Sequence, residues 1–403
     1  RSGRVTGVQT CALPIWQHKN WPNFEFDPNA FNQQIEHFKL KSARLMGTVE
    51  ALPSIYKTDA TVSLMLSEAI KTSAIEGEAL DRDSVRSSIM RLIAEDSTAP
   101  THKDAKVLGA AALMVDVRKE WSAPINDDLL GRWQSMVIAH QPLSLVMRGI
   151  YRNAPEPMQI VSGVYGTRRI YYEAPPAEQI YEEMAAFLTW YNTTSDQYHL
   201  RSSRDNTTSD QYHLRSSRDN TTTIPGPVRA AVAHAWFEII HPFDDGNGRV
   251  GRAISDHALS QSLNQPTLAC LATAIERNRK EYYAQLQKIS CGNLNLNEWI
   301  EFFICEINNA QDIAKEEVDF VLGKARFWER YEDHLNGRQT KMVNRVFAEG
   351  IKGFEGGIST KKYEKICNCS RATAYRDLLK LLKIGVIEQL PGGGRNSRYQ
   401  LVN

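Results

Sequence analysis

Residues 241–252 read HPFDDGNGRVGR, and this stretch decides how the rest of the chain is interpreted. It follows an apolar segment, Val228–Ile240, that has the period of a helix, and a second such segment, Gly251–Asn264, comes after it. Gly246 and Gly248 permit positive φ and a close approach of another group to the backbone. A turn that opens a helix presents free N–H groups and the positive end of the helix dipole. The stretch therefore predicts an anion-binding turn between two helices.

Four polar side chains give this turn a chemistry. Arg249 and Arg252 are three residues apart, on one helical face, and suit forked contacts to phosphate. Asp245 adjoins the turn and is placed to hold a Mg²⁺ ion that bridges phosphate oxygens. His241 has a reference pKa of about 6.5, so most of it is neutral at pH 7 and available as a base. Alone, a histidine at a helix end is usually a cap and Gly-Asn-Gly is usually only a turn, but together these residues predict a phosphate-transfer site.

The same stretch resembles the signature of the Fic family, HxFx(D/E)GNGRxxR, at every fixed position. Most Fic proteins are protein adenylyltransferases, which move AMP from ATP to a Ser, Thr or Tyr hydroxyl of a target protein. Kinases of the related Doc branch usually have Lys at the second glycine, and Gly248 here favours adenylyl transfer. Other members transfer UMP or phosphocholine, or remove AMP from a modified target, and the motif does not separate these outcomes.

The resemblance also implies a role for each motif residue. His241 deprotonates the target hydroxyl, and Asp245 binds Mg²⁺. The substrate phosphates are held by Gly246, Asn247 and Gly248 at the α and β positions, by Arg249 near the β position and by Arg252 at the γ position. ATP and Mg²⁺ are accordingly the expected substrate and cofactor, and a target protein, or the protein itself, is the expected acceptor.

A second motif lies upstream, at Thr72-Ser-Ala-Ile-Glu76-Gly77. A helix predicted over Thr58–Thr72 runs into it, and Gly77 suits the end of that helix. By itself a glutamate at a helix end is nearly always a solvated charge. The segment, however, resembles the inhibitory motif (S/T)xxxE(G/N) of Fic proteins, which implies that Glu76 forms a two-pronged pair with Arg252 and occupies the γ-phosphate position.

Two further segments resemble parts of the family. The hairpin predicted over Val161–Glu173 is similar to the Fic flap, which docks a target segment by adding a strand; the alternative is an ordinary surface hairpin. Tyr282 and Tyr283 resemble a tyrosine pair beside the adenine, and their alternative is core packing.

The C-terminal segment 337–403 differs in charge, with 13 Lys/Arg against 5 Asp/Glu, in a chain whose formal net charge is +1. Its expected order is two short helices, Thr340–Phe347 and Ser359–Ile366, a third helix capped by Ser370, and a hairpin, which is the order of a winged helix-turn-helix.

A winged helix suggests DNA as a partner. Arg371, Thr373 and Arg376 would then enter a major groove, with Arg395 and Arg398 near phosphates, while Leu378, Leu381 and Leu382 form the core. Winged helices also serve as protein-interaction or dimerisation modules, so a homodimer is the other candidate. The competing function from another class is a DNA-binding transcription regulator with a Fic domain.

Two segments do not fit an ordinary domain. Residues 1–15 have neither helical nor strand period and resemble translated sequencing-adapter sequence, so we expect a non-native tail. Asn192–Asp205 recurs without change as Asn206–Asp219, and the repeat reads as a solvated loop. Its alternative is a target-binding or self-modified loop that uses Tyr198 and Tyr212.

Composition agrees with a folded protein of several domains. The chain has 403 residues, 42% of them hydrophobic and 24% charged, which excludes a wholly disordered chain. It has no apolar run of about 18 residues, so no membrane span is expected. Its six cysteines form no CxxC pair and no secretory signal is evident, which favours a cytoplasmic location. We expect a mainly α fold: an N-terminal helical domain (16–100), a Fic-type helical core with a small hairpin (101–322) and the winged helix (337–403).

Overall fold

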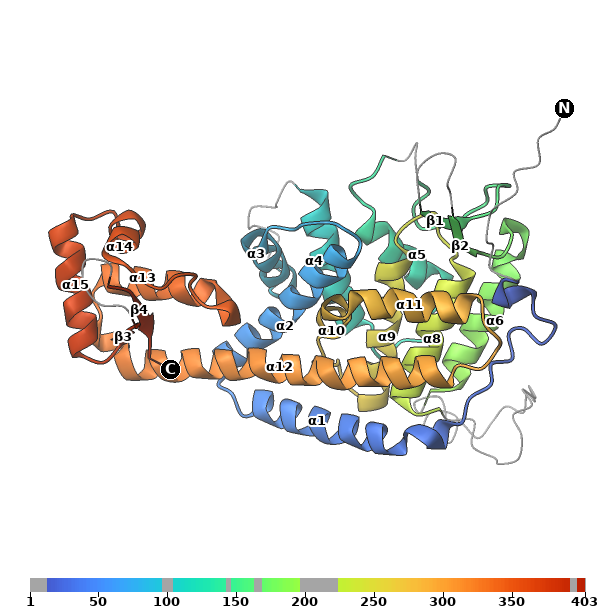
Figure 1. Ribbon diagram of the computed structural model, residues 1–403, viewed down its shortest axis with the longest axis horizontal. Coiled ribbons are helices and arrows are strands. Elements are labelled where there is room, and N and C mark those ends of the chain that lie inside the picture. The colour runs from blue at the N-terminus through green and yellow to red at the C-terminus, as the bar shows by residue number, and fades with distance from the viewer. Residues whose placement is uncertain are drawn as a thin grey trace. The chain divides into compact units, whose positions relative to one another are not determined.

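The computed structural model describes residues 13–95, 104–142, 146–162, 169–195, 224–391 and 397–402. The fold is mainly helical, as the sequence predicts, with two small antiparallel strand pairs in the described residues (Figure 1). Contacts divide the chain into two compact units: Arg1–Gly47 with Thr61–Ala314, and Thr48–Ala60 with Lys315–Asn403. The domain boundaries expected from the sequence stay predictions.

The secondary structure follows the predicted pattern with shifted ends. The helices are α1 (Asn32–Glu50), α2 (Ser54–Ile75), α3 (Arg82–Ile93), α4 (Ala105–Lys119), α5 (Asp127–Val137), α6 (Ile180–Thr193), α8 (Gly226–Ile240), α9 (Asn247–Leu263), α10 (Leu271–Arg277), α11 (Arg279–Ser290), α12 (Asn297–Tyr331), α13 (Gly337–Ala348), α14 (Thr360–Cys367) and α15 (Arg371–Lys383). The strands are β1 (Gln159–Ser162), β2 (Arg169–Glu173), β3 (Ile387–Gln389) and β4 (Tyr399–Leu401). Helix α10 is not predicted, because its 7 residues are too few to show a period.

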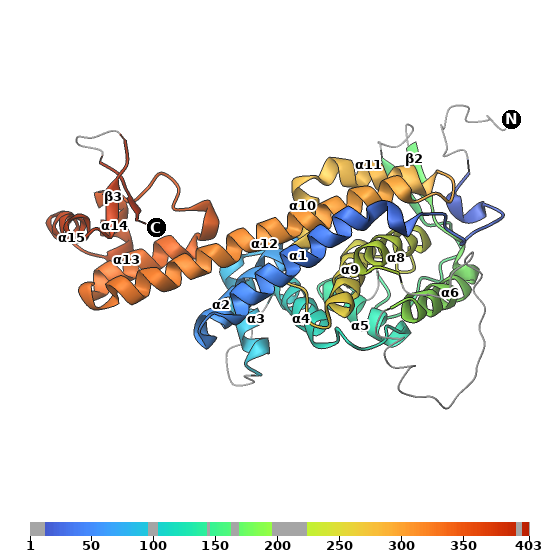
Figure 2. The same ribbon diagram turned by 90° about the horizontal axis from the view of Figure 1, so that it is seen from below.

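Helix α8 lies at the centre of the first unit. Each of its residues is buried except Glu238, which keeps some exposure. A helix with apolar side chains all round must be covered on every side. Helix α9 packs along it, as both views of the fold show, and the Trp299 indole of α12 donates to the Ala231 carbonyl at 2.8 Å (Figures 1 and 2). The turn 241–246 between α8 and α9 is therefore held at both ends by core helices.

The predicted hairpin is present as β1 and β2, which pair antiparallel with Gln159 opposite Glu173. The residues between the strands, 163–168, lie outside the described part. The Tyr172 hydroxyl donates to the Ile239 carbonyl at 2.5 Å, near the end of α8. This bond places the second strand of the hairpin beside the start of the turn.

The second unit contains α13, α14, α15 and the pair β3–β4, in the predicted order. The Ser370 hydroxyl caps α15 by accepting from the Thr373 N–H at 3.2 Å. Leu378 and Leu381 are in the core, but Leu382 is 36% exposed, which corrects the expectation for that residue. It lies on the same side of α15 as the exposed Tyr375 and Leu379. That this unit is a winged helix stays a prediction.

Several expectations fall on residues outside the described part: most of the N-terminal tail, the repeat beyond residue 195 with Tyr198 and Tyr212, and Arg395. Within the described ranges, no helix has the length and apolar character needed to span a membrane.

Candidate active site at the turn between α8 and α9

His241 ends helix α8 in a left-handed conformation, with φ 50° and ψ 59°. Its N–H still donates to the Phe237 carbonyl of the helix at 2.9 Å. Its own carbonyl accepts from Nε of Arg152 at 2.8 Å, and Nη2 of the same buried arginine donates to the Pro175 carbonyl at 2.5 Å. The backbone of His241 is thus fixed by its helix and by Arg152, which precedes the hairpin and is itself bonded to Pro175 after it.

The His241 ring is in its neutral form. Burial, together with the charge of Arg152, lowers its pKa to about 4. Nδ1 is buried without a hydrogen-bond partner in the described structure, and the Glu238 carboxyl lies 3.9 Å from it. Burial and the charge of Glu76 raise the pKa of Glu238 to about 8. At pH 7 the imidazole is therefore more completely neutral than its reference pKa suggests, which leaves a ring nitrogen available to accept a proton.

The turn itself is built by Gly246 and Asn247. Gly246 has φ +88°, and a Cβ there would lie 2.9 Å from the Val137 side chain. The Asn247 side chain bridges the turn: Oδ1 accepts from the Phe243 N–H at 3.0 Å, and Nδ2 donates to the Phe243 carbonyl at 2.7 Å. The Asn247 amide is thus used within the turn, and the predicted contact of Asn247 with phosphate, through its backbone N–H, stays a prediction.

Glu76 lies over the first turn of α9. A Cβ on Gly248 would lie only 2.4 Å from Glu76 Oε1, so the carboxylate approaches the backbone as closely as a glycine allows. Here the first N–H groups of the helix have no acceptor within it, and the dipole favours an anion. The Glu76 carboxylate therefore occupies the anion site that the sequence predicts for phosphate.

The side chain of Arg252 holds this carboxylate from the other side. Nη2 donates to Glu76 Oε1 at 2.7 Å, while Nε donates to Thr72 Oγ1 at 2.8 Å. The pair is thus a single hydrogen bond and not the two-pronged one expected, because Thr72 takes the second edge of the guanidinium. Burial would lower the pKa of Arg252, but the charge and hydrogen bond of Glu76, together with Tyr282 and Glu238, outweigh it and leave the pKa above its ordinary value. Gly77, with φ +83°, ends α2 and lets the chain turn there.

Arg249 is also paired with a carboxylate. Its Nη1 donates to Glu78 Oε2 at 2.9 Å and to the Val137 carbonyl at 3.1 Å. Its Nη2 lies 3.7 Å from Asp245 Oδ1. Both motif arginines are almost fully buried, with 5% and 4% of their side chains exposed. The structure therefore places two buried guanidinium groups, a neutral histidine and a helix N-terminus in one site.

Comparison with known proteins agrees with this site. Residues 124–259, from before α5 into α9, match the Fic/DOC family. The chain carries a Fic/DOC domain. Residues 15–94 match a domain of unknown function, DUF4172.

Individual relatives match over a shorter stretch or at low identity. Protein adenylyltransferase fic-1 of Caenorhabditis elegans is 38% identical over 72 residues, which are 18% of this chain and 13% of that protein. The chain thus spans about an eighth of the length of that curated relative. Among solved structures, a Fic family protein from Desulfovibrio desulfuricans G20 is 17% identical, with 94% of this chain and 98% of that chain covered and a TM-score of 0.48. Fic-1 from C. elegans is 18% identical, with 74% of each chain covered and a TM-score of 0.47. The domain and the fic-1 match support a Fic-type transferase.

Asp245 is the candidate Mg²⁺ ligand of the Fic domain. Its Oδ1 accepts from the Gly246 N–H at 2.5 Å, its Oδ2 accepts from the Gln141 amide, and 44% of its side chain is exposed. No group of three or more His, Cys, Asp or Glu side chains gathers anywhere in the described ranges. One accessible carboxylate fits Mg²⁺, which commonly takes its other ligands from phosphate and water.

The two tyrosines that the sequence predicts beside the adenine, Tyr282 and Tyr283, differ in their exposure. Tyr282 is 1% exposed and its hydroxyl lies 2.7 Å from Nε2 of the buried His234, so it packs in the core, as the alternative reading has it. Tyr283 is 42% exposed, and its hydroxyl donates to the Ile75 carbonyl at 3.4 Å. Only Tyr283 keeps a surface for a ligand, and it lies beside the inhibitory segment.

Three residues of the site are not predicted. Gln134 is fully buried and donates to the Asp245 carbonyl at 3.2 Å. The Arg152 side chain donates to the His241 carbonyl. No local sequence pattern identifies Gln134 or Arg152. Glu78 follows Glu76 by two positions in the same turn, and that spacing is a signal that could have identified it.

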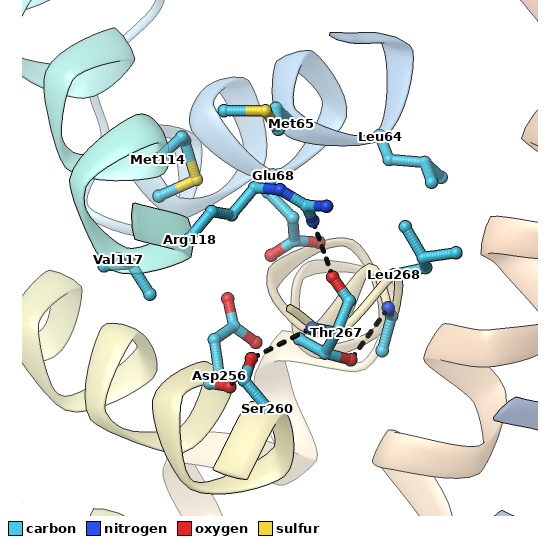
Figure 3. Close-up of a pocket in the computed structure, with 11 residues that line it drawn as sticks. Leu64, Met65, Glu68, Met114, Val117, Arg118, Asp256, Ser260, Thr267 and Leu268 are labelled. Atoms are coloured by element: carbon cyan, nitrogen blue, oxygen red, sulfur yellow. Dashed lines mark hydrogen bonds between the residues drawn. The ribbon is translucent and has the colours of Figure 1, made fainter. Parts of the chain in front are cut away.

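A small cavity lies elsewhere in the first unit, between α2, α4 and α9, where apolar side chains surround the polar groups of Glu68, Arg118 and Asp256 (Figure 3). Its volume is about 30 Å³, room for water and far too small for a nucleotide. Arg118 Nη1 donates to the Thr267 carbonyl at 2.7 Å, and burial raises the pKa of Glu68 to about 7. This cavity is a small void in the packed interior and not a substrate site.

The candidate DNA-contact residues lie in the second unit. Arg371 and Arg376 are exposed on α15, with Thr373 half-buried between them. Arg398 is exposed and donates to the Gly356 carbonyl at 3.1 Å. The same side of the helix exposes three apolar side chains, Tyr375, Leu379 and Leu382.

Proposed function

We propose that this chain is a protein adenylyltransferase that Glu76 holds in an inhibited state. The observation that carries the proposal is the Glu76 carboxylate, which bonds to Arg252 and lies over Gly248 at the N-terminus of α9. An acid in that place competes with the terminal phosphate of a nucleotide for the same guanidinium and the same helix N-terminus.

The residues of the site suit transfer of an adenylyl group to a hydroxyl. The target hydroxyl oxygen attacks the α-phosphorus of ATP and forms the new P–O bond, while its proton passes to the neutral His241 ring. The bond between the α-phosphorus and the bridging oxygen breaks, and pyrophosphate leaves with that bond's electrons. Arg249, Arg252 and the first N–H groups of α9 balance the charge of the phosphates.

Mg²⁺ would be held by Asp245 and would supply charge neutralisation on the phosphates. The hairpin β1–β2 supports docking of the target, because Tyr172 ties it to the end of α8 beside His241. The acceptor is a target protein or the chain itself, and a cytoplasmic location belongs to the same proposal.

The test incubates the Glu76→Gly protein with cell lysate and with ATP, UTP or CDP-choline, each labelled in the transferred group. We expect label on protein from ATP alone. His241→Ala in the same background should abolish labelling and leave ATP binding within about threefold, since the ring is needed for proton transfer more than for binding. His37→Ala, an exposed histidine on α1, is the matched control. Labelling only from UTP or CDP-choline would show a different donor, and loss of AMP from a modified target without any labelling would show the reverse reaction.

A second candidate function, DNA binding, is favoured by one observation: Arg371 and Arg376 are both exposed on α15. A homodimer through this unit is the competing role. The intact Fic motif makes a regulator without transferase activity the weaker of the two proposals.

A further inference from the structure

The guanidinium of Arg249 is held firmly through Nη1, whereas Nη2 has only Asp245 Oδ1 at 3.7 Å. Nη1 carries two N–H groups and has two acceptors, Glu78 Oε2 at 2.9 Å and the Val137 carbonyl at 3.1 Å. Nε is buried and has no hydrogen-bond partner within the described residues. Leaving a buried donor without an acceptor is costly, so the edge that carries Nε is the edge that a phosphate oxygen would satisfy.

Glu78 is held from three directions. Besides Arg249, its Oε1 lies 3.2 Å from Nε2 of His140 and 3.8 Å from Nζ of Lys106. These partners come from α9, from the residues after α5 and from the start of α4. Burial lowers the pKa of His140, so this ring is neutral near pH 7 and the two full charges facing Glu78 are those of Arg249 and Lys106.

The two acids of the segment differ in how firmly they are held. Glu76 has 30% of its side chain exposed and one hydrogen bond, to Arg252. Glu78 has 16% exposed and contacts three side chains. An acid with one bond and open surface can be displaced by a ligand, whereas an acid in contact with three side chains stays with its arginine.

We propose that Glu78 is a positioning residue for phosphate binding, which fixes Arg249 through Nη1 so that Nε and Nη2 face the substrate phosphates. The inference rests on the proposed function, because it concerns the same phosphate site. It assigns opposite tasks to two acids that are two residues apart: Glu76 occupies the site, and Glu78 prepares it.

The test measures ligand binding without turnover. In the Glu76→Gly, His241→Ala background, calorimetry gives the Kd of ATP and of inorganic triphosphate, a probe that lacks the nucleoside. We expect Glu78→Ala to weaken binding of both by about tenfold, the loss typical of one hydrogen bond to a charged group. Glu78→Gln keeps an acceptor for Nη1 and should lose about threefold. Glu276→Gln, which removes the charge of an acid paired with Lys71 at 2.9 Å, is the matched control and should change neither Kd.

A second readout separates positioning from a merely structural role. In the Glu76→Gly protein, Glu78→Gln should raise the KM for ATP and leave kcat within about twofold, because the hydroxyl and the histidine are untouched. If the Glu78→Ala protein fails to fold, the Kd and KM of the Glu78→Gln protein alone test the positioning role of Glu78.

Three results would overturn the inference: triphosphate binding unchanged by the Glu78 variants, tighter binding, which would make Glu78 a second inhibitory acid, or no triphosphate binding in the parent protein. The proposed function fails separately. If ATP labels no protein while triphosphate binding still depends on Glu78, adenylyl transfer is wrong and the role of Glu78 stands.

Discussion

Two ion pairs, one in each unit, use the same chemistry in opposite arrangements. In the Fic domain the arginine is buried and its acid is open: Arg252 has 4% of its side chain exposed and Glu76 has 30%. In the second unit the acid is buried and its arginine is open: Asp377 has 9% exposed and Arg338 has 45%. Asp377 also accepts from the Tyr363 hydroxyl at 3.2 Å and from the Asn336 amide at 3.3 Å.

The difference shows which pair can be exchanged. Burial would raise the pKa of Asp377, but the hydrogen bonds from Arg338, Asn336 and Tyr363, together with the charge of Arg338, outweigh it and lower the pKa, so the carboxylate stays charged and in place. All of its partners belong to the protein, which makes the pair structural. Arg252 is the fixed member of its pair, and its acid has one bond to lose. Under the proposed function, an anion that binds better than Glu76 would replace it, and this pair would act as a switch.

The largest effect is expected where the exchangeable pair is removed. Glu76→Gly frees a hydrogen bond to a charged group and should raise AMP transfer by about 10- to 100-fold, measured as labelled protein per minute. Glu76→Gln keeps the shape of the side chain without its charge, and its rate of AMP transfer should lie between those of the wild-type and Glu76→Gly proteins. The melting temperature should fall, because the almost fully buried Arg252 loses its charged partner. Unchanged transfer in both variants would show that Glu76 does not inhibit.

The structural pair should respond in the opposite way. Asp377→Ala leaves the fully buried Tyr363 hydroxyl without its acceptor, so we expect the free energy of unfolding of this unit to fall by about 2 kcal/mol. The measurement is hydrogen exchange of the α15 amides across urea concentrations in the full chain. Asp333→Ala, an exposed acid of the same unit, is the control and should cost under about 0.5 kcal/mol. Equal exchange in the two variants would contradict a structural role for Asp377.

Of the two ion pairs, only the one in the Fic domain could be predicted from the sequence. The helices around the Fic motif follow from apolar periodicity, and the meeting of Glu76 with Arg252 follows from a resemblance between two short motifs that are far apart in the chain. Neither periodicity nor motif spacing identifies Gln134 or Arg152 as part of the site, and Glu78 is indicated only by its place two residues after Glu76. Their roles depend on how α2, α4 and α5 pack against α9, and a single sequence does not encode that packing in any local pattern.

The same limit explains the residues whose expected roles changed. Asn247 keeps its place in the turn, but the sequence does not show that its amide bonds to the Phe243 backbone. Tyr282 belongs to the pair expected beside the adenine and packs against His234 instead. In the second unit, Leu382 fits the apolar period of α15 but lies at the edge of the core, where it keeps 36% exposure.

A smaller effect is expected for the exposed arginines of α15. If this helix contacts DNA, Arg371→Ala with Arg376→Ala should weaken binding to a short duplex at low salt by about tenfold and reduce the salt slope by about two. Arg345→Ala, an exposed arginine of α13, is the control. Binding that the double variant does not weaken would mean that DNA does not contact α15, and dimerisation that is lost on changing Tyr375 would favour the protein-interaction role instead.

The smallest effect is expected when the pH is changed, because the protonation state of His241 should hardly respond to it. Because burial and Arg152 lower the pKa of His241 to about 4, from an ordinary value near 6.5, the ring stays neutral as the pH falls from 7.5 to 5.5. A ring with the ordinary pKa would lose about tenfold of its neutral form over that range, while this one should lose less than about twofold. The measurement is an NMR titration of the imidazole resonance that the His241→Ala protein lacks.

For a base with a lowered pKa, the linked stability is complete above pH 6.5 and is lost as the pH falls towards 4, so acid unfolding should begin in that window and be delayed in the alanine variant. Removing the negative charge of Glu76 should lower this pKa further, since that charge raises it in the inhibited protein. If the resonance titrates near 6.5 both in the wild-type protein and in a Glu76 variant, the His241 ring is solvated. The contrast between the buried arginine and histidine of the site and the displaceable Glu76 would then have no electrostatic basis.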